Sequence, residues 1–464
     1  MSTTITVDPV TRIEGHARIF IDIDDKGQVE RGHLQVLEIR GFEKLLEKME
    51  LFRMPQVTAR ICGVCPAAHH IVSVMAIENG LGLTVPSTAT MLRELLYMGH
   101  VLHSHALSTF VLLGPDVTLG IGSDPAERNI FGILKAHPDV AKKALRLRSI
   151  GQKVVEIVGG RGVHPVAAVP GGMSARPSAE QMGQIAEWGR ESMSLVTELA
   201  AVVMSKLEDF RDASQSSRLP FHSLAITDRG AFSFLAGDVA VIDQGGSVER
   251  RFAPADYATH LVEHVMPGSY MKSVTLRGAP EKEYLVGPLA RLNIAKTMST
   301  PRANALLQEY RQRHGVALSP VTYIEARLVE LLYCAERMAE ISSAPLPDSP
   351  TRVAATPKEG RFVAAIEAPR GLLVHDYTAD SSGRVLSANL IVATQNNYRA
   401  IDASITSLAR HYMPQGEATL TNAMEFALRC FDPCLSCATH AAGRMPLEIA
   451  LRRNGVTLRT IGRR

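Results

Sequence analysis

Hydrophobic residues recur at helical spacing through most of this chain. Between Thr88 and Leu107 they form an apolar face too wide for a surface helix, which predicts a helix inside a bundle. The same spacing predicts helices over residues 66–79, 140–157, 178–212, 301–313, 320–342, 398–412 and 417–430. A bundle of long helices is therefore the expected core.

Alternating apolar and polar positions predict β-structure beside this core. Ile19, Ile21 and Ile23 alternate with other side chains within residues 4–39, and a return strand follows the turn at Asp25-Lys26-Gly27. Later strands are expected over residues 362–368 and 386–393, and a short helix over residues 41–50. The expected fold class is α+β and predominantly helical, with a central helix bundle and flanking β-regions.

No repeat, low-complexity tract or flexible linker divides the chain, so residues 1–440 are expected to form one large domain. Its parts follow the predicted elements in order. They are an N-terminal β region 1–40, a helical core 41–215 and 300–345, a mixed β region 220–290, and a C-terminal β and helix region 360–440. Residues 441–464 form an extension.

Charge and hydropathy exclude several kinds of partner. The net charge of +3 is near balance and no dense run of Lys or Arg occurs, so neither nucleic acid nor an anionic membrane surface is expected as a partner. No apolar run is long enough to span a membrane. The N-terminus lacks the features of a signal peptide, which favours a cytoplasmic location.

Four of the six cysteines form two Cys-x-x-Cys pairs, one near each end of the chain. These are Cys62 with Cys65 and Cys434 with Cys437. A two-residue spacer lets both thiolates of a pair bind one metal ion, and four thiolates select late transition metals. The sequence therefore predicts a site with four sulfur ligands.

Spacing alone favours a structural zinc site. However, structural zinc ligands usually lie within a few dozen residues of one another, because they stabilise small domains that lack a large core. Here nearly the whole chain separates the pairs, and 464 residues with 46% hydrophobic content can bury a core without zinc. The separation favours a metal that serves chemistry, with structural zinc kept as an alternative.

The residues around the cysteines, Arg60-Ile61-Cys62-Gly63-Val64-Cys65 and Asp432-Pro433-Cys434-Leu435-Ser436-Cys437, belong to a larger set of motifs. Together they resemble the large subunit of nickel-iron hydrogenases, in the family's order and over essentially the full chain. The other matching segments are Asp8-Pro9-Val10-Thr11-Arg12-Ile13-Glu14-Gly15-His16, Arg40-Gly41-Phe42-Glu43, Val169-Pro170-Gly171-Gly172, Gly287-Pro288-Leu289-Ala290-Arg291 and Ala368-Pro369-Arg370-Gly371.

The resemblance implies a Ni–Fe(CN)₂(CO) centre. Cys62 and Cys434 would be terminal nickel ligands, and Cys65 and Cys437 would bridge nickel to an iron that carries two cyanides and one carbon monoxide. Such a centre splits dihydrogen heterolytically and reversibly while a nearby base takes the proton. Backbone N–H groups at the helix start are also expected to stabilise a thiolate at Cys65.

Three further residues receive catalytic or ligand-binding roles from the resemblance. Glu14 would pass the proton outward; the alternative is an ion pair with Arg12. Arg370 would face one cyanide of the iron, where a fixed cationic donor strengthens a hydrogen bond. Thr394 would donate to the second cyanide.

Three more residues are expected to act on the thiolates. His69 would donate a hydrogen bond to a bridging sulfur; the alternative is a core histidine. Arg60 and Asp432 would tune the thiolates by charge; the alternative is a surface ion pair.

The resemblance also implies a buried magnesium ion, or another divalent cation. Glu43 and His440 would be its side-chain ligands, and a main-chain carbonyl near Leu390 would complete the protein's share. A carboxylate is an ordinary magnesium ligand, whereas histidine is less typical.

Two segments depart from the pattern of membrane-associated relatives. His103-Ser104-His105 stands where many of them have an aspartate near the active-site arginine, and Ala393-Thr394-Gln395-Asn396-Asn397 replaces their usual segment. Both features resemble the cytoplasmic, multimeric branch, close to its NAD-coupled members and to those that do not reduce a deazaflavin.

The resemblance implies partners. Only Cys334 and Cys430 remain, too few for an iron–sulfur relay, so iron–sulfur clusters are expected on a small partner subunit only. Further electron-transfer subunits, diaphorase-type or linked to a heterodisulfide reductase, would deliver electrons to NAD⁺ or to a ferredoxin.

The last 24 residues carry a hairpin signal, Arg453-Asn454-Gly455, between two apolar alternations. In the family, such an extension after His440 is removed by a maturation endopeptidase once nickel is inserted. The alternatives are a terminal surface hairpin and, for the whole chain, a regulatory hydrogen sensor. Sensors of that kind generally lack the cleaved tail, so residues 441–464 argue against the sensor.

Overall fold

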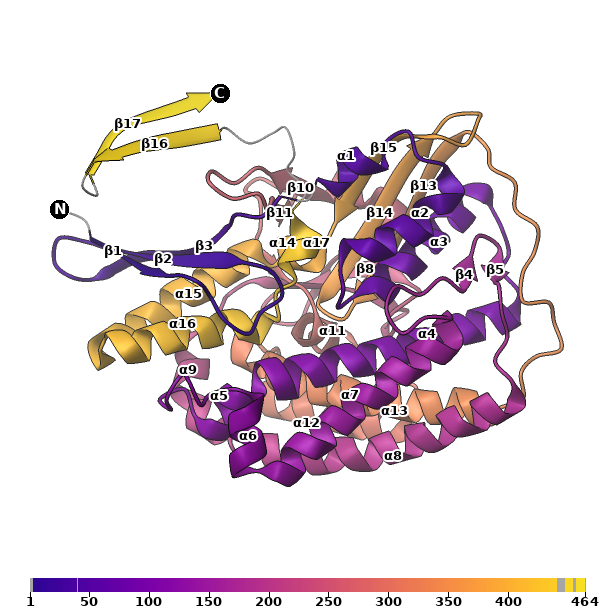
Figure 1. Cartoon of the computed structure of the whole chain (residues 1–464), viewed down its shortest axis with the longest axis horizontal. Coiled ribbons are helices and arrows are strands. Elements are labelled where there is room, and N and C mark those ends of the chain that lie inside the picture. Colours follow the sequence, from indigo (N-terminus) through magenta and orange to yellow (C-terminus); the bar gives the residue numbers. More distant parts are fainter. Residues whose placement is uncertain (1–2, 40, 440–446, 454–455, 464) are drawn as a thin grey trace.

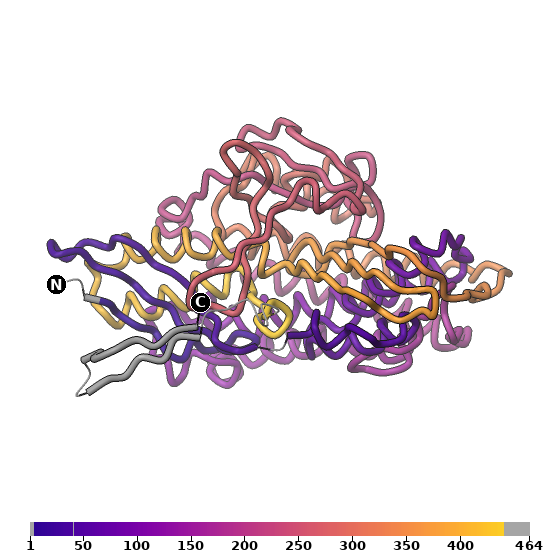
Figure 2. The backbone as a smooth tube through the Cα atoms, turned by 90° about the horizontal axis from the view of Figure 1, so that it is seen from above, coloured from indigo at the N-terminus to yellow at the C-terminus, as the bar shows by residue number. Residues whose placement is uncertain are grey.

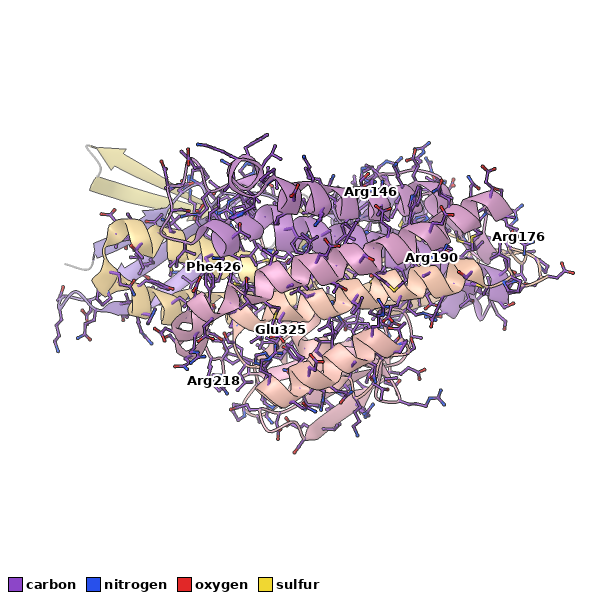
Figure 3. All side chains as sticks on the ribbon, turned by 90° about the horizontal axis from the view of Figure 1, so that it is seen from below. Arg146, Arg176, Arg190, Arg218, Glu325 and Phe426 are labelled. Carbon is purple, nitrogen blue, oxygen red and sulfur yellow. The ribbon has the colours of Figure 1, made fainter. Side chains whose placement is uncertain are left out.

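The computed structural model describes residues 3–39, 41–439, 447–453 and 456–463. Its lower layer is a bundle of four long helices that pack side by side (Figure 1). They are α4 (Ser87–Ala106), α7 (Pro138–Gly159), α8 (Ala179–Met204) and α13 (Tyr323–Ser343). Figure 3 shows this layer from below, with Arg146 on α7 and Arg190 on α8. The expected helix bundle and the α+β class are confirmed.

A three-stranded antiparallel sheet lies above the bundle (Figure 1). It consists of β13 (Gly360–Ala368), β14 (Gly371–Ala379) and β15 (Val385–Ile391). Helix α3 (Pro66–Leu81) packs on β13 and β14 and is buried along most of its length. This contact holds the first cysteine pair against the C-terminal half of the chain.

The N-terminal sheet is also antiparallel and three-stranded. It contains β1 (Thr3–Val7), β2 (Ala17–Ile23) and β3 (Val29–Val36). Helix α15 (Tyr398–Tyr412) packs on β3, and α16 (Glu417–Phe431) lies against α15 and leads to the second cysteine pair. The N-terminal segment and the C-terminal helices therefore meet beside the cluster.

Residues 222–285 form a lobe that projects from the body, as Figure 2 shows. Its larger sheet contains β6 (His222–Asp228), β7 (Ala231–Phe232), β8 (Asp238–Ile242), β9 (Val248–Phe252) and β12 (Tyr284–Leu285), with β12 parallel to β6. A second pair is β10 (Leu261–His264) with β11 (Ser273–Leu276).

The remaining elements are short connecting segments, apart from α12. The helices are α1 (Phe42–Leu46), α2 (Met54–Thr58), α5 (Gly114–Leu119), α6 (Ile130–Ala136), α9 (Arg211–Ser216), α10 (Tyr257–His260), α11 (Pro288–Ile294), α12 (Pro301–His314), α14 (Ala393–Asn396) and α17 (Leu435–Ala438). The strands are β4 (Ala168–Val169), β5 (Gly172–Met173), β16 (Leu447–Arg453) and β17 (Val456–Arg463), and β16 pairs with β17 as the expected hairpin.

Several predicted boundaries are wrong. The helix expected over 41–50 ends at Leu46, and the helix expected over 178–212 ends at Met204, before the separate α9. Strand β15 ends at Ile391, because residues 393–396 turn into α14. Strand β14 was not distinguished from its neighbours, because its residues are apolar on both faces and show no alternation.

Among the described residues, no helix combines the length and the apolar character that a membrane crossing requires.

Candidate metal centre

The four paired cysteines converge on one buried point. Sγ of Cys62 lies 3.1 Å from Sγ of Cys434, and Sγ of Cys65 lies 3.1 Å from Sγ of Cys437. Cys434 and Cys437 are 2.9 Å apart at their sulfurs, and all four sulfurs lie within 4.8 Å of one another. Each cysteine is at most 5% exposed. Four sulfurs at these separations can surround one metal ion.

Turns and helix starts present the sulfurs. Cys62 has an extended backbone, and Cys65 precedes the first residue of α3, where Pro66 suits a position that needs no N–H donor. Cys434 precedes α17 in the same way, and its backbone N–H donates to Oγ1 of Thr394 at 2.9 Å. Both pairs thus use a helix start to direct two sulfurs inward.

The thiols differ strongly in acidity. Hydrogen bonds from the thiols of Cys434, Cys437 and Cys65 hold the pKa of Cys62 well below its usual value, whereas burial raises the pKa values of Cys434 and Cys437. The backbone N–H of Val64 donates to Sγ of Cys62 at 3.2 Å. In the described part of α3 no helix-start N–H contacts Sγ of Cys65, so that expectation is wrong. A bound cation is needed to keep four such sulfurs deprotonated.

A cavity of about 280 Å³ adjoins the sulfurs. Cys65, Cys434 and Cys437 line it, while Cys62 does not. Two polar side chains, Arg370 and Thr394, and four small or apolar side chains complete most of the wall. The cavity therefore offers hydrogen-bond donors within an otherwise apolar space beside three of the four sulfurs.

Arg370 is fixed by Asp432. Its Nε donates to the carbonyl oxygen of Asp432 at 2.7 Å, and its Nη2 donates to Oδ1 of Asp432 at 3.1 Å. Burial lowers the pKa of Arg370, but the Asp432 carboxylate and the cysteine sulfurs raise it well above its usual value overall. Nη1 also lies 3.5 Å from Oγ of Ser104. Oδ2 of Asp432 is buried and has no hydrogen-bond partner among the described residues.

Glu14 reaches the second cysteine pair from the N-terminal segment. Its Oε2 accepts a hydrogen bond from the backbone N–H of Ser436 at 2.9 Å, and its carbonyl oxygen accepts one from Leu435 at 3.2 Å. Gly15 makes the approach possible: its φ is +85°, and a Cβ there would lie 2.7 Å from Cβ of Leu435. Arg12 pairs instead with Asp116 at 2.6 Å, so the alternative ion pair with Glu14 is absent among the described contacts.

His69 lies against a sulfur. Its Nε2 is 3.4 Å from Sγ of Cys437, and its Nδ1 is 3.0 Å from Nε2 of His375. Burial lowers the pKa of His69 to about 4, which makes its imidazole neutral near pH 7. His375 was not singled out from the sequence. The available signal was a polar pair, His375 and Tyr377, at alternate positions of a buried strand.

The carboxylate of Glu43 lies elsewhere, beside β15. Its Oε1 accepts a hydrogen bond from the backbone N–H of Leu390 at 3.0 Å, and both its oxygens lie 3.4 Å from Nζ of Lys272. Lys272 also donates to Glu263 at 2.9 Å, so two carboxylates share one ammonium group. Burial raises the pKa of Glu43. His440 lies outside the described residues, and the sequence analysis missed Lys272 and Glu263.

Arg60 is not part of the cluster in the described contacts. Its exposed side chain donates to the carbonyl oxygen of Gln56, and none of its described contacts involves a cysteine. The structure brings nine of the candidates together: Glu14, Cys62, Cys65, His69, Arg370, Thr394, Asp432, Cys434 and Cys437. Their roles as metal or substrate residues stay predictions.

Known proteins resemble this chain over nearly its whole length. Residues 40–119 and 211–440 match a family described as nickel-dependent hydrogenase, and residues 4–39 match one described as HoxL-like. A subunit of the vhc F420-non-reducing hydrogenase of Methanococcus voltae is 34% identical over 473 residues, which cover 99% of this chain and 100% of the relative. The NAD-reducing hydrogenase HoxS subunit beta of Cupriavidus necator is 33% identical over 476 residues, 97% of each chain.

A solved crystal structure agrees closely with the fold. It is that of an NAD⁺-reducing nickel–iron hydrogenase in the H₂-reduced state, with a TM-score of 0.91 and 34% identity. The match covers 94% of this chain and 99% of the other.

Proposed function

From the premise that this chain belongs to the nickel-dependent hydrogenase family, we propose that it passes electrons from dihydrogen, through a partner iron–sulfur subunit, to a soluble acceptor. The chain is a hydrogenase catalytic subunit. The single observation that carries the proposal is the convergence of Cys62, Cys65, Cys434 and Cys437 within 4.8 Å.

The donor set fits a nickel ion with iron alongside. All four thiolates would hold nickel, with Cys62 and Cys434 as terminal ligands and Cys65 and Cys437 as bridges to iron. The cavity supports this assignment, because it borders both proposed bridging sulfurs and not Cys62. When bound, the centre supplies the polarisation of dihydrogen and accepts its electrons.

Two cavity residues would bind the cyanide ligands of the iron. Arg370 presents a guanidinium that Asp432 fixes in position, and a fixed cationic donor makes a strong hydrogen bond to an anionic ligand. Thr394 accepts the N–H of Cys434, which leaves its hydroxyl hydrogen to donate. Asp432 would thus act through Arg370.

Glu14 is the proposed proton carrier. Its carboxylate is half-buried, and a hydrogen bond from the Ser436 backbone holds it within the second cysteine pair. A carboxylate held between a buried site and the surface can take a proton from the site and release it outward.

A divalent cation, magnesium in the first instance, is proposed at Glu43, with the carbonyl oxygen near Leu390 and His440 as the other protein ligands. The pairing of Glu43 and Glu263 around Lys272 supports a place that favours positive charge. Metal analysis that finds about one magnesium ion per chain, lost in Glu43→Gln, would support this site; a magnesium content unchanged by Glu43→Gln would contradict it.

The acceptor and the partners are proposed from the chemistry and from the relatives. The four-cysteine group is the only cluster of metal-ligating side chains found among the described residues, so electrons need a relay on another subunit. The relatives that are NAD-reducing and F420-non-reducing favour NAD⁺, or a ferredoxin or heterodisulfide partner, as acceptor. Diaphorase-type or heterodisulfide-linked subunits, a maturation endopeptidase and a cytoplasmic location belong to the same proposal. Hydrogen-dependent reduction of each acceptor by the purified complex distinguishes them.

Metal analysis and infrared spectroscopy of the purified complex test the centre. We expect one nickel and one additional iron per chain, together with absorption between about 1900 and 2100 wavenumbers from the diatomic iron ligands, a property of outer-sphere-tuned metal centres. One zinc ion with neither nickel nor these bands would establish the structural zinc alternative. The same centre with hydrogen-dependent signalling and no acceptor turnover would establish the sensor alternative.

A further inference from the structure

A chain of four buried polar side chains starts at the sulfur of Cys437 and runs into the core. Nε2 of His69 lies 3.4 Å from that sulfur, and Nδ1 of His69 lies 3.0 Å from Nε2 of His375. Nδ1 of His375 lies 2.5 Å from the hydroxyl of Tyr377, which lies 3.1 Å from Oγ of Ser73. Each of the four residues is at most 1% exposed.

The fold places these residues in register. His69 and Ser73 are one turn apart on α3, and His375 and Tyr377 are alternate residues on β14, which packs against α3. Four residues of a helix rise about 6 Å. Two residues of a strand rise about 6.8 Å. The two pairs therefore match in length, and the helix and the sheet hold the chain rigidly.

We propose that His375 and Tyr377 are positioning residues for the metal centre, which fix the tautomer of His69 so that its Nε2–H donates to the Cys437 sulfur. This inference rests on the proposed function, because a metal-bound thiolate can only accept a hydrogen bond. A neutral imidazole carries a single N–H, so a donor at Nε2 of His69 leaves Nδ1 as an acceptor.

The remaining donors follow from that choice. His375 must donate from Nε2 to His69, so its own Nδ1 must accept the hydroxyl hydrogen of Tyr377. The opposite direction starts when Tyr377 donates to Ser73 and His375 donates from Nδ1 to Tyr377. His69 would then present a lone pair to the sulfur, an arrangement that suits a thiol and repels a thiolate.

The chain orients His69 and does not carry protons to solvent. It ends at Ser73, which is fully buried, whereas Glu14 is half-buried beside the same cysteine pair. Partners that donate through a ligand's neighbour set the electron density on metal-bound sulfur and the reduction potential of the centre. Loss of the hydrogen bond would make the Cys437 sulfur a stronger donor to the metals.

Infrared spectroelectrochemistry of the purified complex with single-hydroxyl variants tests the inference. In Tyr377→Phe the carbonyl band should shift to lower wavenumber, the midpoint potential of the centre should become more negative, and hydrogen oxidation should fall about 10-fold to 100-fold. His375→Phe, which removes both nitrogens, should give the same shifts and serves as the second variant. Nickel content should stay at the wild-type value in both.

Ser73→Ala is the matched control, because it removes the other hydroxyl of the same contact. It leaves the donor of Tyr377 in place, so band and potential should stay at their wild-type values. Tyr398→Phe removes a buried hydroxyl that donates to the Leu34 carbonyl at 2.7 Å, and should also leave them unchanged. Wild-type bands in Tyr377→Phe, or equal shifts in Tyr377→Phe and Ser73→Ala, would overturn the inference. Absence of diatomic bands from the wild type would instead refute the proposed function, and this inference with it.

Discussion

Glu14 and Ser436 meet across 422 positions of sequence: Oε2 of Glu14 accepts the backbone N–H of Ser436 at 2.9 Å. The contact joins the N-terminal segment to the turn between Cys434 and Cys437. It fixes a carboxylate beside the sulfur cluster without using a side-chain partner that could neutralise it. A group held in this way can exchange protons while its position stays constant.

Glu14→Gln separates the position of this group from its ability to carry a proton. The amide oxygen can still accept the Ser436 N–H, but the side chain can no longer ionise. We expect hydrogen-dependent dye reduction to fall about 100-fold or more, with nickel content and infrared bands unchanged. Glu38→Gln, a surface change in the pair with His16, should keep full activity. Full activity in Glu14→Gln would exclude Glu14 as the proton carrier.

Gly15→Ala tests whether close packing of the two chain ends sets the cysteine geometry. A Cβ at position 15 would lie 2.7 Å from Cβ of Leu435, and the φ of +85° adds backbone strain of about 1–3 kcal/mol. We expect a lower free energy of unfolding and less nickel per chain. Gly27→Ala has a similar φ of +77° and no neighbour within 4 Å, so it should lose stability but keep its nickel. Equal nickel contents in the two variants would contradict this account.

Asp402→Asn should change how stability depends on pH. Burial raises the pKa of Asp402 to about 7, although the Leu34 N–H and Arg31 act in the opposite direction. In the unfolded chain this carboxyl has a pKa of about 3.9. Between these values the folded state keeps a proton that the unfolded state releases, so the contribution of Asp402 to stability is present at low pH and is lost as the pH rises toward 7.

The asparagine cannot ionise and can still accept the Leu34 N–H, which donates to Asp402 at 2.8 Å. Urea denaturation between pH 4 and 8 should therefore show the variant gaining on the wild type, by up to about 4 kcal/mol in unfolding free energy, and levelling off above pH 7. A gap that stays constant with pH would show that Asp402 titrates normally in the folded protein.

Periodicity and local motifs predicted the helix bundle and the sulfur cluster because both depend on patterns that short segments carry. The spacing of Cys62 and Cys65, and of Cys434 and Cys437, already places each pair on one turn. The end of α8 at Met204 could not be predicted in this way, because the residues up to Asp212 keep helical character and tertiary contacts decide where the helix stops.

Partners brought together by the fold were also beyond the sequence. His375 and Lys272 contact residues more than 200 positions away, and nothing in their own segments specifies those contacts. Arg60 shows the converse, because its place next to Cys62 in sequence suggested an electrostatic role, yet its side chain turns back to Gln56. Sequence adjacency predicts contact only when the backbone directs both side chains to the same side.

Removal of the C-terminal extension should change both the mass and the charge of the protein. Residues 441–464 contain six arginines and one glutamate, so residues 1–440 hold 44 basic and 46 acidic residues against a net charge of +3 for the whole chain. If an endopeptidase cleaves after His440, active enzyme from its native source should end at His440 and have a lower isoelectric point than the full-length chain. Intact mass spectrometry and isoelectric focusing of nickel-loaded and nickel-free fractions provide the measurement. Nickel-loaded, active enzyme that retains Arg464 would show that the extension is a permanent part of the protein.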